Sequence, residues 1–310
     1  MSDLVASGVL SEPEWTAREQ RHVARADRFV LPHQERAARD EAHPVWDFLF
    51  TYYSLRPRQL RRWHPGYGMR LAGAAAGRFA ARTGYAAADD GTVGVDVAYL
   101  RGRRETVAFV AELLRATAGR APRLNCFGLH EWAMVYRTPE VRHGQVPLRL
   151  GPSGTDAVVE SMPLRCSHFD AYRFFTEAAA PRNATALTRA GQIASEQPGC
   201  VHAAMDLYKW AYKLGPLVDG ELLLDCLDLA GAAREIDMRA SPYDLTAFGF
   251  APIAVETPAG RATYVRAQQD LADRAAPLRS ALAARCDLLL TAIDGDVVGT
   301  RPGLATVTHG

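Results

Sequence analysis

The sequence HAAMDLYKWAYKL, residues 202–214, places four polar residues at regular intervals among apolar and aromatic ones. At about 100° per residue, the polar positions 202, 206, 209 and 213 fall within an arc of about 60° on one helical face. The other faces are apolar or aromatic, a pattern typical of a helix that is buried on most of its sides. The stretch therefore predicts a buried helix with one polar stripe, around which other helices pack.

The polar stripe consists of His202, Asp206, Lys209 and Lys213, and it holds the only two lysines among 310 residues, since the other 34 basic side chains are arginine. Lysine can lose its proton and act as a nucleophile or a base, whereas arginine effectively cannot. Buried charge without a partner is costly, so the stripe faces a cavity or pairs internally. We interpret it as a catalytic site; the alternative is an Asp206–Lys209 pair on an exposed face.

Segments on both sides of this helix repeat the helical pattern. Helices are expected at 12–40, 43–55, 98–117, 124–137, 200–214, 219–239, 243–248 and 261–290. From Val146 the polarity alternates around a Gly-Pro-Ser-Gly turn, which predicts a β-hairpin or short sheet in the middle of the chain. The expected fold class is mainly α (α+β): one bundle-like globular domain over 1–293, with 140–180 as the place for any subdivision, and a flexible tail at 294–310.

Composition limits the function classes. Hydrophobic residues make up 48% and charged residues 23% of the chain, values typical of globular proteins. No apolar run reaches the roughly 18 residues of a membrane span, and the N-terminus does not resemble a secretory signal. Five dispersed cysteines without a CxxC pair predict neither a disulfide framework nor a zinc ribbon. We expect a reduced, cytoplasmic protein whose net charge of +1 requires a local basic patch for any DNA contact.

Two short motifs carry further candidate catalytic side chains. In GLHEW, residues 128–132, the side chains of His130 and Glu131 point about 100° apart on a helix, so both cannot face one small target. His130 is otherwise a core histidine with a satisfied hydrogen bond. In CSHFD, residues 166–170, a strand places Cys166, His168 and Asp170 on one face. Neighbours at i, i+2 lie about 7 Å apart, which is long for a thiolate–imidazolium pair.

Metal binding is the alternative chemistry for these residues. Two histidines and a carboxylate suit Fe(II), Mn or Zn, and the candidate ligands are His130, His168, His202 and Asp206, although their spacing matches no established motif. Glu196 precedes the 200–214 helix across the Pro198-Gly199 turn, and we assign its carboxylate to stabilising the helix N-terminus.

Basic and aromatic residues provide candidate substrate contacts. The basic run with an adjacent tryptophan suits a phosphate backbone or an anionic substrate, or else forms a solvated helix face: Arg56, Arg58, Arg61, Arg62 and Trp63. Arg239 is a further candidate. The candidate walls of an aromatic pocket are Tyr52, Tyr53, Trp63, Trp132, Tyr172, Phe174 and Trp210.

Five strings, in chain order, resemble a family of actinobacterial proteins of about this length that is commonly labelled 3-methyladenine DNA glycosylase. They are HPVWDFLFTYYSLRPRQLRRWHPG, CFGLHEWAMVYR, CSHFDAYRFF, EQPGCVHAAMDLYKWAYKL and DMRASPYDL, and the resemblance extends from about residue 12 to about residue 290. The label implies a DNA-repair enzyme. The chain has neither the helix-hairpin-helix signature nor the Cys/His zinc pattern of known alkylbase glycosylases, so the resemblance supplies no catalytic residue.

Three functions follow. The favoured one is an N-glycosidase that removes an alkylated purine from DNA without a cofactor. The base leaves the stack, Asp206 or Asp170 stabilises the sugar cation or activates water, and Lys209 can attack C1′. The second is an oxygenase or hydrolase that uses Fe, Mn or Zn to act on a small molecule. The third is a binding protein for a nucleotide or nucleic acid without catalytic activity, which exposure of Asp206 and Lys209 would favour.

Overall fold

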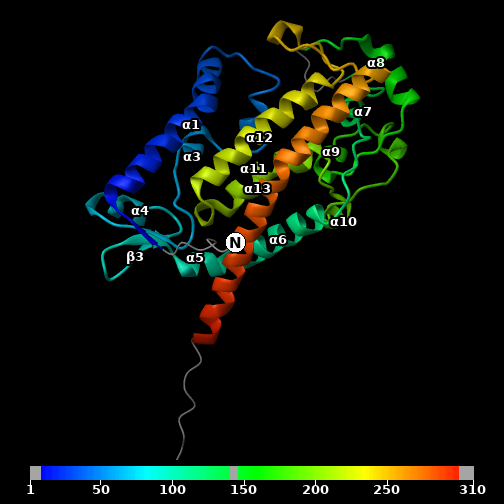
Figure 1. The fold of residues 1–310 in the computed structure, drawn as a ribbon. Helices are drawn as coiled ribbons and strands as arrows, with labels where there is room; N and C mark the ends of the chain where they lie inside the picture. Colours follow the sequence, from blue (N-terminus) through cyan, green and yellow to red (C-terminus); the bar gives the residue numbers. More distant parts are fainter. Residues whose placement is uncertain (1–7, 140–145, 300–310) are drawn as a thin grey trace, which may run out of the picture.

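The structure is a computed structural model that describes residues 8–139 and 146–299. Its framework is a group of long helices (Figure 1). Helix α11 (Val201–Leu214) packs against α12 (Gly220–Arg239) and α13 (Pro258–Gly299), and α6 (Arg104–Ala118) packs against α13. The fold is mainly helical with one small sheet, and the predicted helices at 200–214 and 219–239 are confirmed.

Helix α11 lies at the centre of this group because its surface outside the polar stripe is apolar or aromatic. All residues from Val201 to Ala211 are buried. The helix ends where Gly215 adopts a positive φ of 60°, which glycine tolerates best, and Pro216 cannot continue it. Asp219 caps the N-terminus of α12, since its carboxylate accepts a hydrogen bond from the backbone N–H of Leu222 at 2.9 Å. The two helices are therefore joined by a short turn, in which Gly215 and Pro216 end α11 and Asp219 caps α12.

The N-terminal region covers one end of α12. Helix α1 (Glu12–Ala38) begins with a capping box between Ser11 and Glu14 and packs against α12. The predicted helix at 43–55 is reduced to α2 (Phe48–Thr51), because residues 44–47 form turns and Ser54 has a positive φ of 58°. Pro57 then occupies the first turn of α3 (Pro57–Leu60).

The sheet does not lie where the sequence predicts it. Its order is β1-β2-β4-β3, with β1 (Gly8–Leu10) parallel to β2 (Met69–Leu71), and with β4 (Val93–Val95) antiparallel to both β2 and β3 (Tyr85–Ala87). The prediction of a hairpin after Val146 is wrong.

Helix α8 (Gly151–Ser161) replaces that hairpin. Pro152 of the Gly-Pro-Ser-Gly sequence occupies its first turn, where the missing N–H is not needed, so this sequence starts a helix and does not close a turn. Only the isolated bridges Leu148–Tyr243 and Leu164–Asn183 have β character in this part of the described chain.

Other helical predictions hold with changed boundaries. The 98–117 helix is split at Arg103 into α5 (Val97–Gly102) and α6, and the 124–137 helix is reduced to α7 (Leu129–Ala133). The remaining short elements are η1 (Ala74–Ala76), α4 (Gly77–Ala80), α9 (Phe169–Tyr172), η2 (Ala180–Arg182), α10 (Gln192–Ser195), η3 (Gly215–Leu217) and η4 (Thr246–Phe248).

The C-terminal helix is longer than expected. Helix α13 extends through 294–299, the first part of the predicted tail, and the rest of that tail lies outside the described residues. The main core contains buried residues from Leu10 to Ile293. Within the described ranges, no helix is both long and apolar enough to cross a membrane.

Candidate functional site

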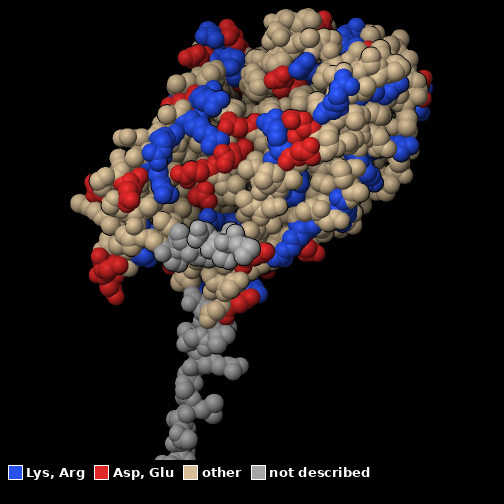
Figure 2. Space-filling model, viewed as in Figure 1, with Lys and Arg blue, Asp and Glu red and all other residues tan. Residues whose placement is uncertain are grey.

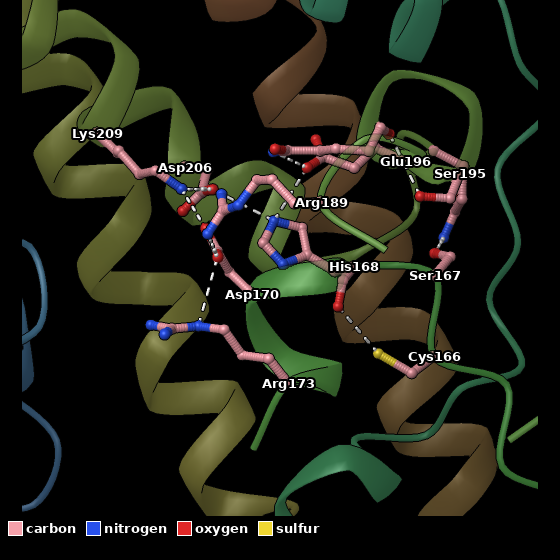
Figure 3. Close-up of polar contacts among 12 residues, drawn as sticks. Cys166, Ser167, His168, Asp170, Arg173, Arg189, Ser195, Glu196, Asp206 and Lys209 are labelled. Atoms are coloured by element: carbon pink, nitrogen blue, oxygen red, sulfur yellow. Dashed lines mark hydrogen bonds and ion pairs between the residues drawn. The ribbon is translucent and has the colours of Figure 1, made fainter. Parts of the chain in front are cut away.

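The polar stripe of α11 lies inside the molecule. His202, Asp206 and Lys209 are buried, and Lys213 at the end of the helix is exposed. Nζ of Lys209 lies 2.6 Å from Oδ2 of Asp206 and 2.7 Å from Oδ2 of Asp170, so the ammonium bridges two carboxylates (Figure 3). The alternative of an exposed Asp206–Lys209 pair is wrong, and the exposure that would favour a binding protein without catalytic activity is not observed.

A second imidazole meets the stripe at Asp206. Nε2 of His168 lies 3.2 Å from Oδ2 of Asp206 and 3.3 Å from Oε1 of Glu196. Neither ring nitrogen of His168 makes a hydrogen bond to any described residue. We call His168, Glu196, Asp206 and Lys209 the His168 cluster. Figure 3 shows its side chains converging from three segments of the chain.

Hydrogen bonds from outside the His168 cluster fix both of its carboxylates. Nε2 of Gln192 donates to Oε1 of Glu196 at 2.6 Å, and the hydroxyl of Tyr53 donates to Oδ1 of Asp206 at 3.2 Å. Glu196 is only 2% exposed and belongs to this buried cluster, contrary to its predicted role at the helix N-terminus. Nothing in the sequence around the Pro198-Gly199 turn predicts that the carboxylate of Glu196 points into the protein interior.

The CSHFD motif reaches the cluster by a route different from the predicted one. Residues 165–168 form a loop and α9 begins at Phe169, so there is no strand face shared by Cys166, His168 and Asp170. His168 and Asp170 still contact the cluster. Sγ of Cys166 instead donates to the backbone carbonyl of His168 at 3.5 Å, and burial raises the pKa of this thiol to about 12. A thiolate–imidazolium pair is therefore absent.

A further buried cluster joins α7 to α12. Nε2 of His130 lies 2.6 Å from Oδ1 of Asp237, while Nη1 of Arg234 lies 2.8 Å from Oε1 of Glu131 and 3.0 Å from Oδ2 of Asp237. We call these four residues the His130 cluster. His130 and Glu131 contact different partners, as their predicted 100° separation requires. Arg234 and Asp237 were not predicted, although their i, i+3 spacing on a helix was a usable signal.

His202 lies between the two clusters. Its ring centroid is 4.4 Å from that of His130 and 5.2 Å from that of His168, and it makes no hydrogen bond to a described residue. Burial, together with the positive charge of His130, lowers the pKa of His202 well below its ordinary value, so its imidazole is neutral at pH 7.

The pKa values of several ionisable groups around His202 are raised. Although burial opposes ionisation, Asp237 raises the pKa of His130 and Glu196 raises the pKa of His168. Burial also opposes the charge of Lys209, yet Asp206 and Asp170 outweigh it and raise the pKa of the ammonium. Burial raises the pKa of Glu196. Lys209 is therefore held protonated, and a free amine able to form a Schiff base is disfavoured.

A cavity of about 290 Å³ opens beside the clusters. Its lining is aromatic on one side and polar on the other, and consists of Phe48, Thr51, Tyr52, Glu131, Met134, Asp170, Ala171, Phe174, His202 and Arg234. The rings of Phe48 and Tyr52 stack with centroids 4.7 Å apart. Of the predicted aromatic walls, Tyr52 and Phe174 line this cavity.

Other predicted aromatic contacts lie outside the cavity lining. Trp63 is fully buried against Phe79, and Trp132 is fully buried with its indole N–H donating to the carbonyl of Ala240 at 2.8 Å. Tyr172 and Trp210 are also absent from the lining. Large aromatic rings are as suited to a core as to a pocket, and sequence alone does not separate the two roles.

The predicted basic contacts lie away from the cavity as well. Arg61 forms an ion pair with Asp27, whereas Arg56, Arg58 and Arg62 are exposed. Arg239 bonds Glu235 at 3.1 Å and the carbonyl of Ala251 at 3.0 Å. None of these five arginines lines the cavity.

Comparison of the chain with protein-family models, with curated proteins and with solved structures finds no match.

Proposed function

We propose that the protein is a metal-dependent enzyme that acts on a small molecule, with a divalent ion bound by His168, Glu196 and Asp206. The spacing of these side chains carries the proposal. Nε2 of His168 lies 3.2 and 3.3 Å from the two carboxylates, yet it makes no hydrogen bond to a described residue. An ion about 2.1 Å from two ligand atoms, at a near-tetrahedral angle, holds those atoms about 3.4 Å apart. The observed separations are those expected of two ligands on one ion, and they also match ion pairs of His168 with the two carboxylates.

The neighbouring set of His130, His202 and Asp237 fits an ion less well. Both sets offer ligand atoms that all lie within 4.8 Å of one another. However, Nε2 of His130 and Oδ1 of Asp237 are only 2.6 Å apart. That distance is typical of a charge-assisted hydrogen bond and is too short for two ligands of one ion. We therefore assign the ion to the His168 cluster alone.

The balance of buried charge supports the same assignment. In the His130 cluster, two carboxylates meet Arg234 and an imidazole whose pKa is raised. Around His168, the carboxylates of Asp170, Glu196 and Asp206 are all buried, and they meet Lys209 and the imidazole of His168, whose pKa is also raised. Three buried carboxylates thus meet one ammonium and one imidazole, so a divalent ion that takes the place of the proton on His168 would add compensating charge to the His168 cluster.

The ligand types indicate which ion fits. One imidazole and two carboxylates suit Mn, Fe(II) or Zn, the metals expected from the sequence under the metal hypothesis. Gln192 and Tyr53 each hold one carboxylate in place, as hydrogen-bond partners outside a metal site ordinarily do.

The cavity supplies the place for the substrate. Its volume of about 290 Å³ admits a small molecule, and the stacked rings of Phe48 and Tyr52 offer a face for a planar apolar part. Asp170, which is bonded to Lys209, and His202, whose ring centroid is 5.2 Å from that of His168, connect the cavity to the His168 cluster. A neutral imidazole at the cavity wall can accept a proton, so we assign His202 as the general base for a hydrolytic reaction.

Metal analysis by ICP-MS of protein purified without chelator tests the proposal. We expect about one Mn, Fe or Zn per chain in the wild type, retained in a Glu235→Gln control and lost in Glu196→Gln and Asp206→Asn. Circular dichroism verifies that each variant folds. If the wild type stays metal-free after dialysis against each ion in turn, the metal site is refuted.

Activity is tested on the metal-loaded protein. A panel of small esters, amides and phosphate monoesters serves as substrate, and His202→Gln serves as the inactive comparison because it removes the proposed base. Turnover of a panel member that falls at least tenfold in this variant supports the role of His202. Equal rates in wild type and variant contradict it.

An N-glycosidase acting on DNA is the second candidate, favoured by the stacked Phe48–Tyr52 wall and the carboxylates of Glu131 and Asp170 at the cavity. Basic and acidic side chains are intermixed on the face shown in Figure 2, so that face offers no continuous basic track for a duplex. This candidate predicts duplex binding with a steep salt dependence and release of alkylated purine. Because Lys209 is held protonated, we expect borohydride trapping on abasic DNA to fail.

A further inference from the structure

A second hollow lies beside α11 and shares no lining residue with the first cavity. Its volume is about 630 Å³, and it is lined by Arg103, Glu105, Thr106, Phe109, Arg189, Gln192, Trp210 and Lys213. These residues come from α6 and α11, from the junction before α6, and from the segment around the start of α10. Of its lining residues, only Gln192 has a role in the function proposed above, through its hydrogen bond to Glu196.

The lining carries three cations and one carboxylate. Nη2 of Arg189 pairs with Asp170 at 2.7 Å, and Nη2 of Arg103 donates to the backbone carbonyl of Lys213 at 2.5 Å. The ammonium of Lys213 has no carboxylate within ion-pair distance among the described residues, and it lies 5.5 Å from the centroid of the Trp210 ring. The hollow therefore has excess positive charge, centred on an exposed lysine with an unpaired ammonium.

Aromatic rings lie next to this charge. Trp210 and Phe109 meet edge to face with centroids 5.5 Å apart, and Trp210 is only 6% exposed, so its ring is fixed in position. A fixed ring beside an unpaired ammonium offers apolar contact and a counter-charge to the same molecule. The C-terminal carbonyls of α11 would repel an anion, but the bond from Arg103 to the Lys213 carbonyl offsets this effect at the last turn.

We propose that this hollow binds a small molecule in which a phosphate or carboxylate group is attached to a planar apolar body. Lys213 binds the anionic group, with Arg189 and Arg103 adding positive charge, and the edge of Trp210 contacts the planar body. An uncharged aromatic molecule leaves Lys213 unpaired, and an inorganic anion leaves the rings uncovered. The combination is therefore expected to bind more tightly than either part.

Isothermal titration calorimetry with phenyl phosphate tests this site on the full chain, with inorganic phosphate and phenol as the two partial probes. We expect phenyl phosphate to bind more tightly than both, and added salt to weaken its binding. Lys213→Ala should weaken it about tenfold or more, because a charge-assisted hydrogen bond is lost. Lys213→Arg, which keeps the charge, should stay within about threefold of the wild type.

Arg58→Ala is the matched control, because it removes an exposed cation far from the hollow and should leave the affinity unchanged. Lys213 is exposed, so its variants are expected to fold normally. The site is refuted if phenyl phosphate binds no better than inorganic phosphate, if wild-type protein gives no binding at millimolar probe, or if Lys213→Ala and Arg58→Ala have equal effects. None of these outcomes depends on whether the His168 cluster binds a metal.

Discussion

The two buried clusters of this protein contain the same kinds of side chain and differ in spacing. Each has an imidazole, two carboxylates and one long cation. In the His130 cluster the imidazole and the guanidinium make hydrogen bonds of 2.6 to 3.0 Å to the carboxylates, while Oε2 of Glu131 and Nε and Nη2 of Arg234 have no hydrogen-bond partner among the described residues. In the His168 cluster the imidazole stands 3.2 to 3.3 Å from both carboxylates without a hydrogen bond. The two clusters therefore differ in the distance from the imidazole to the carboxylates more than in their residue types, and this distance distinguishes the proposed ion site from the other network.

Removing the cation of the His130 cluster should have the largest effect on stability. Arg234→Met leaves Glu131 and Asp237 buried without their guanidinium, and should lower the free energy of unfolding by about 3–5 kcal/mol. Urea denaturation followed by circular dichroism measures the loss. Adding Mn²⁺ or Zn²⁺ should not restore it, because the 2.6 Å contact between His130 and Asp237 is too short for two ligands of one ion. A loss below about 1 kcal/mol would show that the network contributes little stability.

The same experiment on the His168 cluster should give a different dependence on metal. Lys209→Met removes the ammonium that bridges Asp206 and Asp170, and should cost about 3 kcal/mol in metal-free protein. A bound ion supplies the missing charge, so Mn²⁺ or Zn²⁺ should recover part of the loss.

The other lysine provides the matched control for that variant. Lys213→Met removes an exposed side chain on the same helix and should change the free energy of unfolding by less than about 0.5 kcal/mol. If Lys209→Met behaves like Lys213→Met, the bridge is not stabilising. If divalent ions rescue Arg234→Met equally well, the distinction between the two clusters is wrong.

The sequence predicted features that depend on neighbouring residues, but it did not predict contacts between residues far apart in the chain. Residues 202–214 predicted a buried helix with a polar stripe, because helical periodicity is local and read directly from the spacing. Arg234 and Asp237 were missed because their partners in α7 lie more than 100 residues earlier in the chain. Glu196 was assigned to a helix N-terminus because only the fold brings His168 to it. The strands were missed because each has three residues, too few to show alternation.

The stability of the His130 cluster should depend on pH. Burial opposes the charge of His130, but Asp237 outweighs this and raises the pKa of the imidazole. A histidine with a raised folded-state pKa stabilises the protein fully below its unfolded pKa of about 6.5, and this contribution is lost as pH rises through the folded value. Wild-type stability should therefore decline on the alkaline side, by at most about 1.4 kcal/mol per pH unit from this group.

The variant His130→Gln isolates the contribution of His130 to the pH dependence of stability. Glutamine can donate to Asp237 but does not titrate, so the alkaline decline should become shallower while the fold is kept. Urea denaturation at several pH values from 6 to 9 measures both slopes. Parallel curves for the wild type and the variant would mean that His130 is not protonated in the folded protein.

The smallest expected effect concerns two tyrosines whose rings lie edge to face with centroids 5.4 Å apart. The hydroxyl of Tyr53 donates to Oδ1 of Asp206 at 3.2 Å, whereas the buried hydroxyl of Tyr208 has no hydrogen-bond partner among the described residues. Tyr53→Phe should therefore cost about 1 kcal/mol, since it removes a hydrogen bond to a buried carboxylate.

Tyr208→Phe is its control and should be neutral or slightly stabilising, because it removes a buried polar group that lacks a partner. The difference between the two variants, measured by urea denaturation, isolates the hydrogen bond from the ring packing that both share. In metal-loaded protein, Tyr53→Phe should also weaken ion binding, because Asp206 loses the contact that orients it. Equal stability and equal ion affinity in the two variants would mean that the Tyr53 hydroxyl does not hold Asp206 in place for the ion.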